Sequence, residues 1–276
     1  MNATTVKILC KLNNDFYRNH HASFSATRKT PWPGWKTCLD VLRNVCADDW
    51  RDFCRNLTVF DLACGNLRFE KYIASELSKE FPDIKPRFFA IDNCDGMVSR
   101  TPDLSYQSLD VLDTLQQGFD INAQLTAPLC DIAVSFGFMH HVPSRELRQK
   151  VLLSLIRQTR RGGFVFVSFW QFQNDRVMTD RARVVHERAL KELNLLDLDG
   201  NDLDGNELDD NDYLLGWENT PGVYRYCHSF TNAEIDQLLA SVADKANLVS
   251  RFVSDGRTSN LNAYLVLKVL EDGKEV

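Results

Sequence analysis

Short apolar runs alternate along the chain with longer stretches in which apolar residues recur at helical spacing. Several of the short runs end at glycine, aspartate or asparagine, which is typical of buried β-strands. These runs cover residues 57–65, 87–93, 106–113, 130–142 and 164–170. The stretches at residues 66–81 and 145–159 predict amphipathic helices. The apolar face of the second is formed by Leu147, Val151, Leu152 and Leu155.

Strand and helix signals alternate through most of the sequence, and this alternation predicts an α/β fold. The expected architecture is a Rossmann-like, doubly wound and largely parallel sheet in a single domain, residues 1–276. Residues 171–230 interrupt the rhythm, and we interpret them as a cap inserted over the active site. Residues 1–45 are expected to form an N-terminal helical lid for substrate and cofactor. After the cap, a helix and two apolar runs follow at residues 232–239, 248–253 and 263–270.

Polar residues follow three of the predicted strands, at the sheet edge where such folds bind ligands. The turn DLACGN, residues 61–66, follows the first strand, and its Gly65 lets the backbone approach a ligand. Asp92 ends the second strand and is suited to accept hydrogen bonds from both hydroxyls of a ribose. Asp110, with the aliphatic Val111 beside it, is suited to hold an adenine. Together these residues predict a nucleoside site.

The glycine content of the first turn distinguishes two cofactors. A dinucleotide turn has three glycines that cradle a pyrophosphate, whereas this turn has one, and Leu67 stands where a second is expected. S-adenosylmethionine has no phosphate and needs no such cradle, so it is favoured over NAD. Asp61 is then placed to orient the loop or the positive end of the methionine moiety. Asp131, which lies near the start of the fourth apolar run, is expected to be structural.

Charge is distributed unevenly. The chain carries a net charge of −6, but residues 192–218 contain ten acidic side chains and no lysine or arginine. The remainder of the chain therefore carries +4. Residues 142–191 alone hold eleven basic and four acidic side chains. This distribution permits a polyanionic partner such as tRNA without requiring one.

Cysteine spacing and hydropathy exclude several classes of protein. The eight cysteines form no CxxC pair, so no metal site is expected. No segment is apolar enough for a signal peptide or a membrane span, so we expect a cytoplasmic protein with reduced thiols and no membrane partner. The segment LDGNDLDGNELDDND resembles a calcium loop but lacks the EF-hand spacing. We interpret residues 192–218 as a solvated acidic loop within the cap.

Segments outside the sheet motif resemble a known family. Residues 16–35, FYRNHHASFSATRKTPWPGW, resemble the N-terminal signature of the tRNA wobble-uridine 5-carboxymethyl methyltransferases, which are class I S-adenosylmethionine-dependent enzymes. The matching residues are Tyr17, Phe24, Ser25, Thr27, Arg28, Pro31, Trp32 and Pro33. Later segments that resemble the same family are FGFMHHV (136–142), DYLLGW (212–217) and YRYCHSF (224–230).

This resemblance implies methyl transfer to the carboxylate of a 5-carboxymethyl uridine, which gives a methyl ester. A carboxylate is already a nucleophile at neutral pH, so the enzyme needs positioning more than a strong base. Arginine forks grip carboxylates at fixed geometry, which favours Arg28 and Arg225. The histidines expected to contact substrate are His140, His141 and His228. A small activating protein is a further partner that the resemblance allows.

The expected site is therefore extensive. The expected cofactor contacts are Arg28, Trp32, Asp61, Ala63, Gly65, Asn66, Asp92, Asn93, Asp110, Val111 and Phe136. The expected substrate contacts are Trp32, Trp217 and Tyr226, because aromatic rings stack on splayed bases.

Other roles stay open at this point. Trp32 is equally suited to core packing, paired histidines to structural hydrogen bonds, and Arg225 to an ion pair with the acidic loop. The fold also serves small-molecule methyltransferases that act on carboxylates or hydroxyls, and noncatalytic subunits. A narrow closed pocket would favour a small-molecule methyltransferase. Failure to bind S-adenosylmethionine would favour a noncatalytic subunit.

Overall fold

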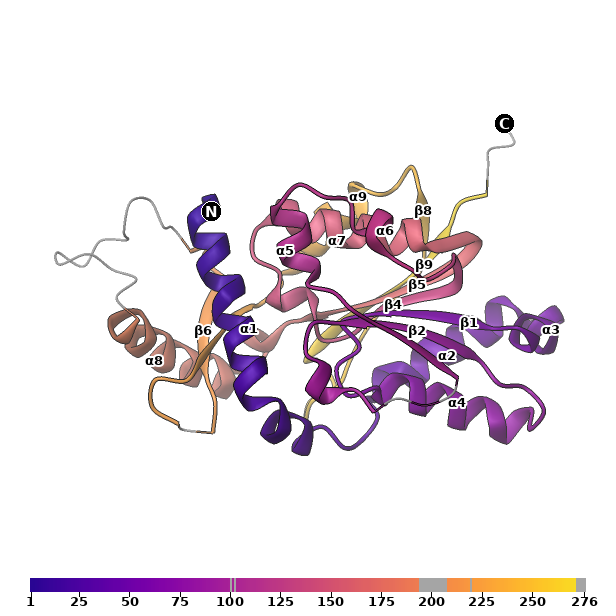
Figure 1. The fold of residues 1–276 in the computed structure, drawn as a ribbon, viewed down its shortest axis with the longest axis horizontal. Coiled ribbons are helices and arrows are strands. Elements are labelled where there is room, and N and C mark those ends of the chain that lie inside the picture. Colours follow the sequence, from indigo (N-terminus) through magenta and orange to yellow (C-terminus); the bar gives the residue numbers. More distant parts are fainter. Residues whose placement is uncertain (100, 102, 194–207, 219, 272–276) are drawn as a thin grey trace.

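A seven-stranded sheet forms the centre of the computed structural model, which describes residues 1–99, 101, 103–193, 208–218 and 220–271 (Figure 1). Its strand order is β3-β2-β1-β4-β5-β9-β8, and β9 is the one strand of this sheet that runs opposite to the others. The predicted α/β fold is thus confirmed. The strands are β1 (Thr58–Leu62), β2 (Arg87–Asp92), β3 (Leu104–Ser108), β4 (Cys130–Ser135), β5 (Thr159–Trp170), β8 (Ala246–Ser254) and β9 (Asn262–Val269).

Helices cover both faces of this sheet, as Figure 1 shows. One layer consists of α2 (Pro33–Val45), α3 (Trp50–Arg55) and α4 (Arg68–Glu80). The opposite layer consists of α5 (Val111–Gln116), α6 (Ile121–Gln124), α7 (Arg145–Gln158) and α9 (Asn232–Ala240). Short 3-10 turns lie at η1 (Ala47–Asp49), η2 (Asp95–Met97), η3 (Met139–His141) and η4 (Phe172–Asn174). None of the described helices is long and apolar enough to cross a membrane.

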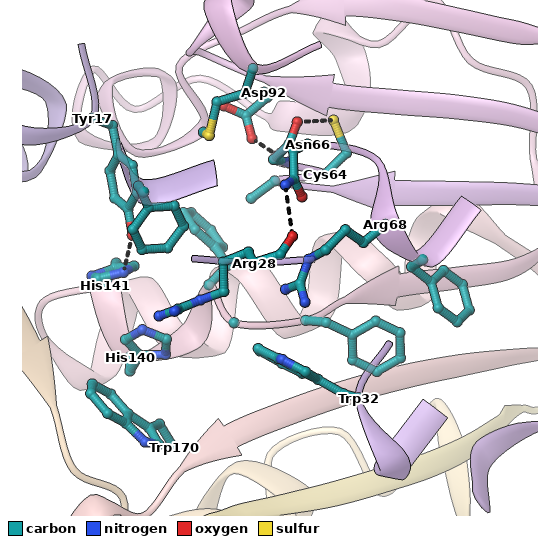
Figure 2. A pocket seen from close by; sticks show the side chains of 18 of the residues that line it. Tyr17, Arg28, Trp32, Cys64, Asn66, Arg68, Asp92, His140, His141 and Trp170 are labelled. Atoms are coloured by element: carbon teal, nitrogen blue, oxygen red, sulfur yellow. Dashed lines mark hydrogen bonds between the residues drawn. The ribbon is translucent and has the colours of Figure 1, made fainter. Parts of the chain in front are cut away.

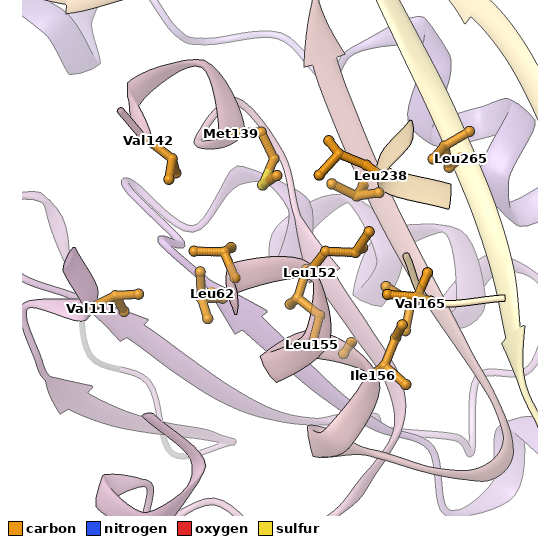
Figure 3. Packing of buried hydrophobic residues seen from close by; sticks show 14 of the residues in the cluster. Leu62, Val111, Met139, Val142, Leu152, Leu155, Ile156, Val165, Leu238 and Leu265 are labelled. Atoms are coloured by element: carbon orange, nitrogen blue, oxygen red, sulfur yellow. The ribbon is translucent and has the colours of Figure 1, made fainter. Parts of the chain in front are cut away.

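Each face of the sheet has its own hydrophobic core. Figure 3 shows the larger one, in which α7 packs against β1, β4 and β5. The apolar face that the sequence predicts for α7 is confirmed, because Val151, Leu152 and Leu155 are fully buried and Leu147 is 5% exposed. The second core lies between the sheet and α2, α3 and α4. The sheet is therefore a rigid support for residues at its carboxyl edge.

Two further pieces lie beyond that edge. The first is α1 (Ala3–Ala26), which Figure 1 shows between the sheet and the second piece. The second comprises α8 (Arg176–Glu192) and a two-stranded antiparallel sheet of β6 (Asp212–Gly216) and β7 (Tyr224–His228). They fall in the segments interpreted from the sequence as lid and cap. Most of the predicted acidic loop, residues 194–207, lies outside the described residues.

Candidate active site

A cavity of about 590 Å³ lies at the carboxyl ends of β1, β2 and β4. Such a volume is within the range of small-molecule and cofactor sites. All of the residues expected to contact the cofactor line it: Arg28, Trp32, Asp61, Ala63, Gly65, Asn66, Asp92, Asn93, Asp110, Val111 and Phe136. Arg225, His140 and His141 line it as well. Figure 2 shows Arg28 between the turn after β1 and the two histidines.

The turn after β1 is fixed by the acid that ends β2. One carboxylate oxygen of Asp92 accepts a hydrogen bond from the Gly65 amide at 2.8 Å, and the other accepts one from the Cys94 amide at 2.9 Å. Gly65 has a φ of +55°, and nothing lies within 4 Å of the position a Cβ would occupy. The backbone at Gly65 is therefore open to a ligand, and Asp92 holds it in place.

Leu67 adopts a left-handed backbone conformation, with a φ of 58°. This explains why a glycine is usual there, since leucine pays a steric cost in that conformation. The Leu67 side chain is 3% exposed and packs with Cys64 and Ala90. Its burial offsets the backbone strain, so the turn forms without the second glycine.

Asp110 connects three elements near the cavity. One of its oxygens caps α5 through the Asp113 amide at 2.9 Å. The other accepts hydrogen bonds from the side-chain amides of Asn14 at 2.6 Å and Asn93 at 3.0 Å. Asn14 also accepts one from Asn93 at 2.8 Å. These bonds join α1 to the carboxyl ends of the strands.

The PWPG segment positions Trp32 over the cavity. Pro33 begins α2, and the Gly34 amide donates to a carboxylate oxygen of Asp255 at 3.0 Å. A Cβ on Gly34 would lie 2.3 Å from the Tyr264 ring, so only glycine allows this close approach. Trp32 in turn covers Gly137, where a Cβ would lie 3.0 Å from the indole.

The linker between α1 and α2 is tied to the turn after β1. The side-chain amide of Asn66 donates to the Arg28 carbonyl at 3.2 Å, and Arg68 donates to the Thr30 carbonyl at 2.9 Å. The Arg68 guanidinium also lies 5.3 Å from the centre of the Trp32 ring. The linker and the cofactor turn therefore form one wall of the cavity.

Arg28 and Arg225 lie near each other in the part of the cavity beside the two histidines. Burial, and then the charge of Arg225, lower the pKa of Arg28. Arg225 is 8% exposed, and its Nε has no hydrogen-bond partner. The aromatic rings within 5.7 Å of its guanidinium are those of Phe16, Phe24 and Trp217. Within the described ranges, neither arginine has a carboxylate at ion-pair distance. This part of the cavity is suited to an anion.

The two histidines beside these arginines are held neutral. Burial is the main cause, followed for His141 by Arg225 and for His140 by His141 and Arg225. Together these lower the pKa of His141 to about 3 and that of His140 well below its usual value. Nδ1 of His141 lies 2.9 Å from the Tyr226 carbonyl, and Nε2 lies 2.7 Å from the hydroxyl of Tyr17. Because burial raises the pKa of Tyr17 to about 12, this hydroxyl is not a base either.

Three residues that were expected to contact substrate do not line the cavity. Successive side chains of a strand point to opposite faces, so Tyr226 and His228 face away from Arg225. The Tyr226 hydroxyl bonds to Asp212 at 2.7 Å and to Arg148 at 2.9 Å. Nδ1 of His228 bonds to the same carboxylate oxygen at 2.7 Å. Both side chains are fully buried. We therefore assign them no contact with substrate.

Trp217 is the third of these residues. Its Nε1 donates to the hydroxyl of Ser23 at 2.9 Å, and its ring packs beside Phe16 and Phe24. Its ring packs against the Arg225 guanidinium and does not line the cavity. The structural role expected of Asp131 is confirmed, because one of its oxygens accepts bonds from the Thr58 amide and hydroxyl.

Several residues of the site were not predicted from the sequence. Asn13 is 4% exposed and binds both the amide and the carbonyl of Tyr226, at 2.7 and 3.2 Å. Asn14, Tyr17 and Asp255 also line the cavity. Of these four residues, Tyr17 alone could have been predicted from the sequence, because it belongs to the N-terminal signature. The other three make contacts that no local sequence pattern indicates.

One cluster has donor atoms that metals use. A nitrogen of His140, one of His141 and the thiol of Cys227 lie within 4.8 Å of one another. However, both nitrogens of His141 already have partners, Tyr17 and the Tyr226 carbonyl. We therefore propose no metal here.

Comparisons with known proteins bear on the fold. No family model matches the sequence, and no curated protein matches it. Solved structures do match. An S-adenosylmethionine-dependent methyltransferase from Methanosarcina mazei is 15% identical with a TM-score of 0.53, over 79% of this chain and 94% of that one.

The chain has the fold of the class I methyltransferases. Magnesium protoporphyrin IX methyltransferase from Synechocystis PCC 6803, with bound S-adenosylhomocysteine, is 14% identical with a TM-score of 0.51, over 93% of this chain and 97% of that one. The same enzyme with bound S-adenosylmethionine is 12% identical with a TM-score of 0.50, over 98% of both chains. At these identities the likeness concerns the fold alone.

Proposed function

We propose that this chain is an S-adenosylmethionine-dependent methyltransferase whose acceptor is a carboxylate. The observation that carries the proposal is the division of the cavity into two parts. One part has an open glycine turn held by Asp92, and the other has Arg28 and Arg225 beside neutral histidines.

The residues of the first part fit the adenosyl donor. Gly65 leaves space for a ligand, Asp92 lies where a ribose is bound in such folds, and Asp110 lies beside Val111 at the expected place of an adenine. Asp61 lines the cavity between this turn and the centre of the site. When bound, the cofactor supplies an electrophilic methyl group. The proposal of this cofactor is supported by two solved structures of similar fold, which hold bound S-adenosylhomocysteine and S-adenosylmethionine.

The second part of the cavity favours an acceptor that is already ionised. Neutral His140 and His141 have depressed pKa values and hold a proton poorly, so they are weak bases at neutral pH. A hydroxyl or an ammonium acceptor must lose a proton and would require a stronger base. A carboxylate is already ionised and would not. Arg28 and Arg225 would hold the carboxylate in line with the methyl group. Positioning of this kind can lower a barrier by about 7–11 kcal/mol.

The finer proposal is that the carboxylate belongs to a 5-carboxymethyl uridine at the wobble position of tRNA. Its support is that Tyr17, Phe24, Arg28 and Trp32, all from the family signature, line one cavity. Trp32 and Trp170 offer rings on which a base can stack. A small-molecule carboxylate is the alternative, and a cavity of about 590 Å³ is compatible with it.

A methyl-transfer assay tests both proposals, that the acceptor is a carboxylate and that this carboxylate belongs to a uridine of tRNA. The protein would be incubated with methyl-labelled S-adenosylmethionine and tRNA bearing 5-carboxymethyl uridine. Controls are tRNA bearing the neutral carbamoylmethyl uridine, and the free carboxymethyl nucleoside. We expect base-labile label in the first tRNA only. Label in the nucleoside but not in tRNA would support the small-molecule alternative. Equal label in the carbamoylmethyl tRNA would contradict a carboxylate acceptor.

A further inference from the structure

Three arginines line the cavity, and a single carboxylate acceptor accounts for two of them, Arg28 and Arg225. The third is Arg68, which lies close enough to Arg28 for their charges to act on each other. A fourth cation that lines the cavity is Lys29. Within the residues that the structure describes, neither Arg68 nor Lys29 has a carboxylate at ion-pair distance. These two cations therefore have no counter-charge and no part in the proposed function.

Arg68 makes fewer hydrogen bonds than a guanidinium can. One of its terminal nitrogens donates to the Thr30 carbonyl at 2.9 Å, and the guanidinium lies 5.3 Å from the centre of the Trp32 ring and 5.2 Å from that of Trp35. Figure 2 shows it directed toward Arg28 and Trp32. Burial, and then the charge of Arg28, lower the pKa of Arg68 to about 10, so it stays cationic at neutral pH. A guanidinium has further N–H donors, and these are available to a ligand.

The one acid that acts on Arg68 among the described residues is bound to other groups. Asp255 acts on it from beyond ion-pair distance. The oxygens of Asp255 accept hydrogen bonds from the Gly34 amide, the Asn262 side chain and the Tyr264 hydroxyl. A partly buried cation without a counter-charge in contact costs free energy, and an anionic ligand recovers part of that cost.

Lys29 and Thr30 lie at the mouth of the cavity. Both residues line the cavity and are also exposed, so they mark the place where it opens to solvent. The hydrogen bond to the Thr30 carbonyl brings Arg68 to the same place. A guanidinium, an ammonium and a hydroxyl are groups that proteins commonly use to bind phosphate.

We propose that Arg68 and Lys29 form a phosphate subsite at the mouth of the cavity, separate from the carboxylate-binding pair Arg28 and Arg225. The ligand is a phosphate group attached to the acceptor molecule, either in an RNA backbone or in a free nucleotide. The link between this phosphate and the methylated carboxylate rests on the proposed function. Binding of the phosphate itself requires neither the donor nor methyl transfer.

Titration with inorganic phosphate, followed by phosphorus NMR line broadening, tests the subsite directly. We expect saturable binding that weakens by about tenfold in Arg68→Gln and in Lys29→Met, because each variant loses a charged hydrogen bond. Arg68→Lys keeps the positive charge and should retain most of the affinity. The matched control is Lys79→Met, on the same helix as Arg68 but paired with Glu76, and it should bind phosphate as the natural protein does.

Unchanged phosphate affinity in Arg68→Gln would overturn the inference. An equal loss of affinity in Arg68→Lys and Arg68→Gln would also overturn it, because Arg68 would then act by holding the cavity wall at Trp32 and Thr30. Binding that is weakened only in Arg225→Met would place the anion at the acceptor pair instead, with the same consequence for the subsite.

Two acceptors distinguish the source of the phosphate. If the source is an RNA backbone, tRNA bearing 5-carboxymethyl uridine should bind with a salt dependence whose log–log slope is smaller by about 0.7 in Arg68→Gln. If it is a free nucleotide, 5-carboxymethyl uridine monophosphate should be methylated in preference to tRNA, with a KM that rises about tenfold in Arg68→Gln.

Equal use of the free nucleoside and both phosphate-bearing acceptors would overturn the inference and leave a carboxylate methyltransferase. Absence of methyl transfer to every acceptor would remove the proposed function, whereas the titration with inorganic phosphate would still decide whether the subsite exists.

Discussion

Arg225 is a buried cation that aromatic rings hold in place. Its guanidinium lies 5.3 Å from the centre of the Trp217 ring and near Phe16 and Phe24, and its Nε is unpaired. Cation–π contacts of this kind recover part of the desolvation cost but leave the Nε donor without a partner. A residue in this state is stabilised further when an anionic ligand arrives.

Replacement of this arginine should therefore impair acceptor binding without loss of the fold. For Arg225→Met we expect kcat/KM for the carboxylate acceptor to fall by about 100-fold, which corresponds to loss of a charged hydrogen bond of about 2.7 kcal/mol. The affinity for S-adenosylmethionine should change little. Thermal stability should be equal or higher, because an unpaired buried charge is removed. Steady-state kinetics and calorimetry measure these quantities.

Arg183→Met is the matched control, since Arg183 is exposed on α8. It should leave kcat/KM unchanged. If Arg225→Met retained full activity, or if both variants lost activity equally, the assignment of Arg225 to the acceptor would be wrong.

At the residue scale, some of the predicted site residues line the cavity and others do not, for a simple reason. Asp92 and Gly65 were predicted to lie at the site because each is marked by its place at a strand end. Tyr226 and His228 were assigned from a resemblance alone. The alternation of side chains along YRYCHSF would have placed them on the face opposite Arg225.

At the scale of elements, Asn13 joins α1 to the cap. The Asn13 side chain donates to the Tyr226 carbonyl and accepts from its amide, as a neighbouring strand would. Asn13→Ala would leave both buried backbone groups unpaired. We expect the free energy of unfolding to fall by about 2–6 kcal/mol, because each buried backbone group left unpaired costs about 1–3 kcal/mol. Urea denaturation measures this change.

Lys11→Ala, at an exposed position of the same helix, serves as the control. It should change the free energy of unfolding by less than about 0.5 kcal/mol. A similar small change for Asn13→Ala would show that α1 is not anchored through this side chain.

The junction of β7 and α9 should depend on pH. Burial acts to raise the pKa of Glu234, but hydrogen bonds from His228 and Thr231 outweigh it and lower the pKa from 4.5 to about 2. Because the folded-state pKa is depressed, this group contributes stability above about pH 4.5, and the contribution is lost as pH falls toward 2. Acid unfolding followed by circular dichroism should therefore be less steep between pH 4.5 and 2 in Glu234→Gln.

The comparison variant is Glu187→Gln, at an exposed position of α8. Its acid-unfolding profile should match that of the natural protein. Identical profiles for Glu234→Gln and the natural protein would contradict the proposed contribution of this carboxylate.

At the scale of the whole molecule, local patterns predicted the fold well and the assembly of the site only in part. Apolar runs and helical spacing are local signals, so the strands and α7 were predictable. The bonds that close the site join distant segments, since Asn13 and Tyr226 are 213 positions apart and Gly34 and Asp255 are 221 apart. No periodicity encodes such pairs, and Asp255 was accordingly missed.

The proposed function requires that the cavity beyond β1, β2 and β4 holds S-adenosylmethionine through the turn that Asp92 fixes. Calorimetry of S-adenosylmethionine binding to the natural protein, Asp92→Asn and the exposed control Asp83→Asn tests this requirement. We expect saturable binding that weakens by about tenfold or more in Asp92→Asn, because charge-assisted hydrogen bonds are lost, and that is unchanged in Asp83→Asn. No binding to the natural protein, or equal affinity in all three, would contradict it.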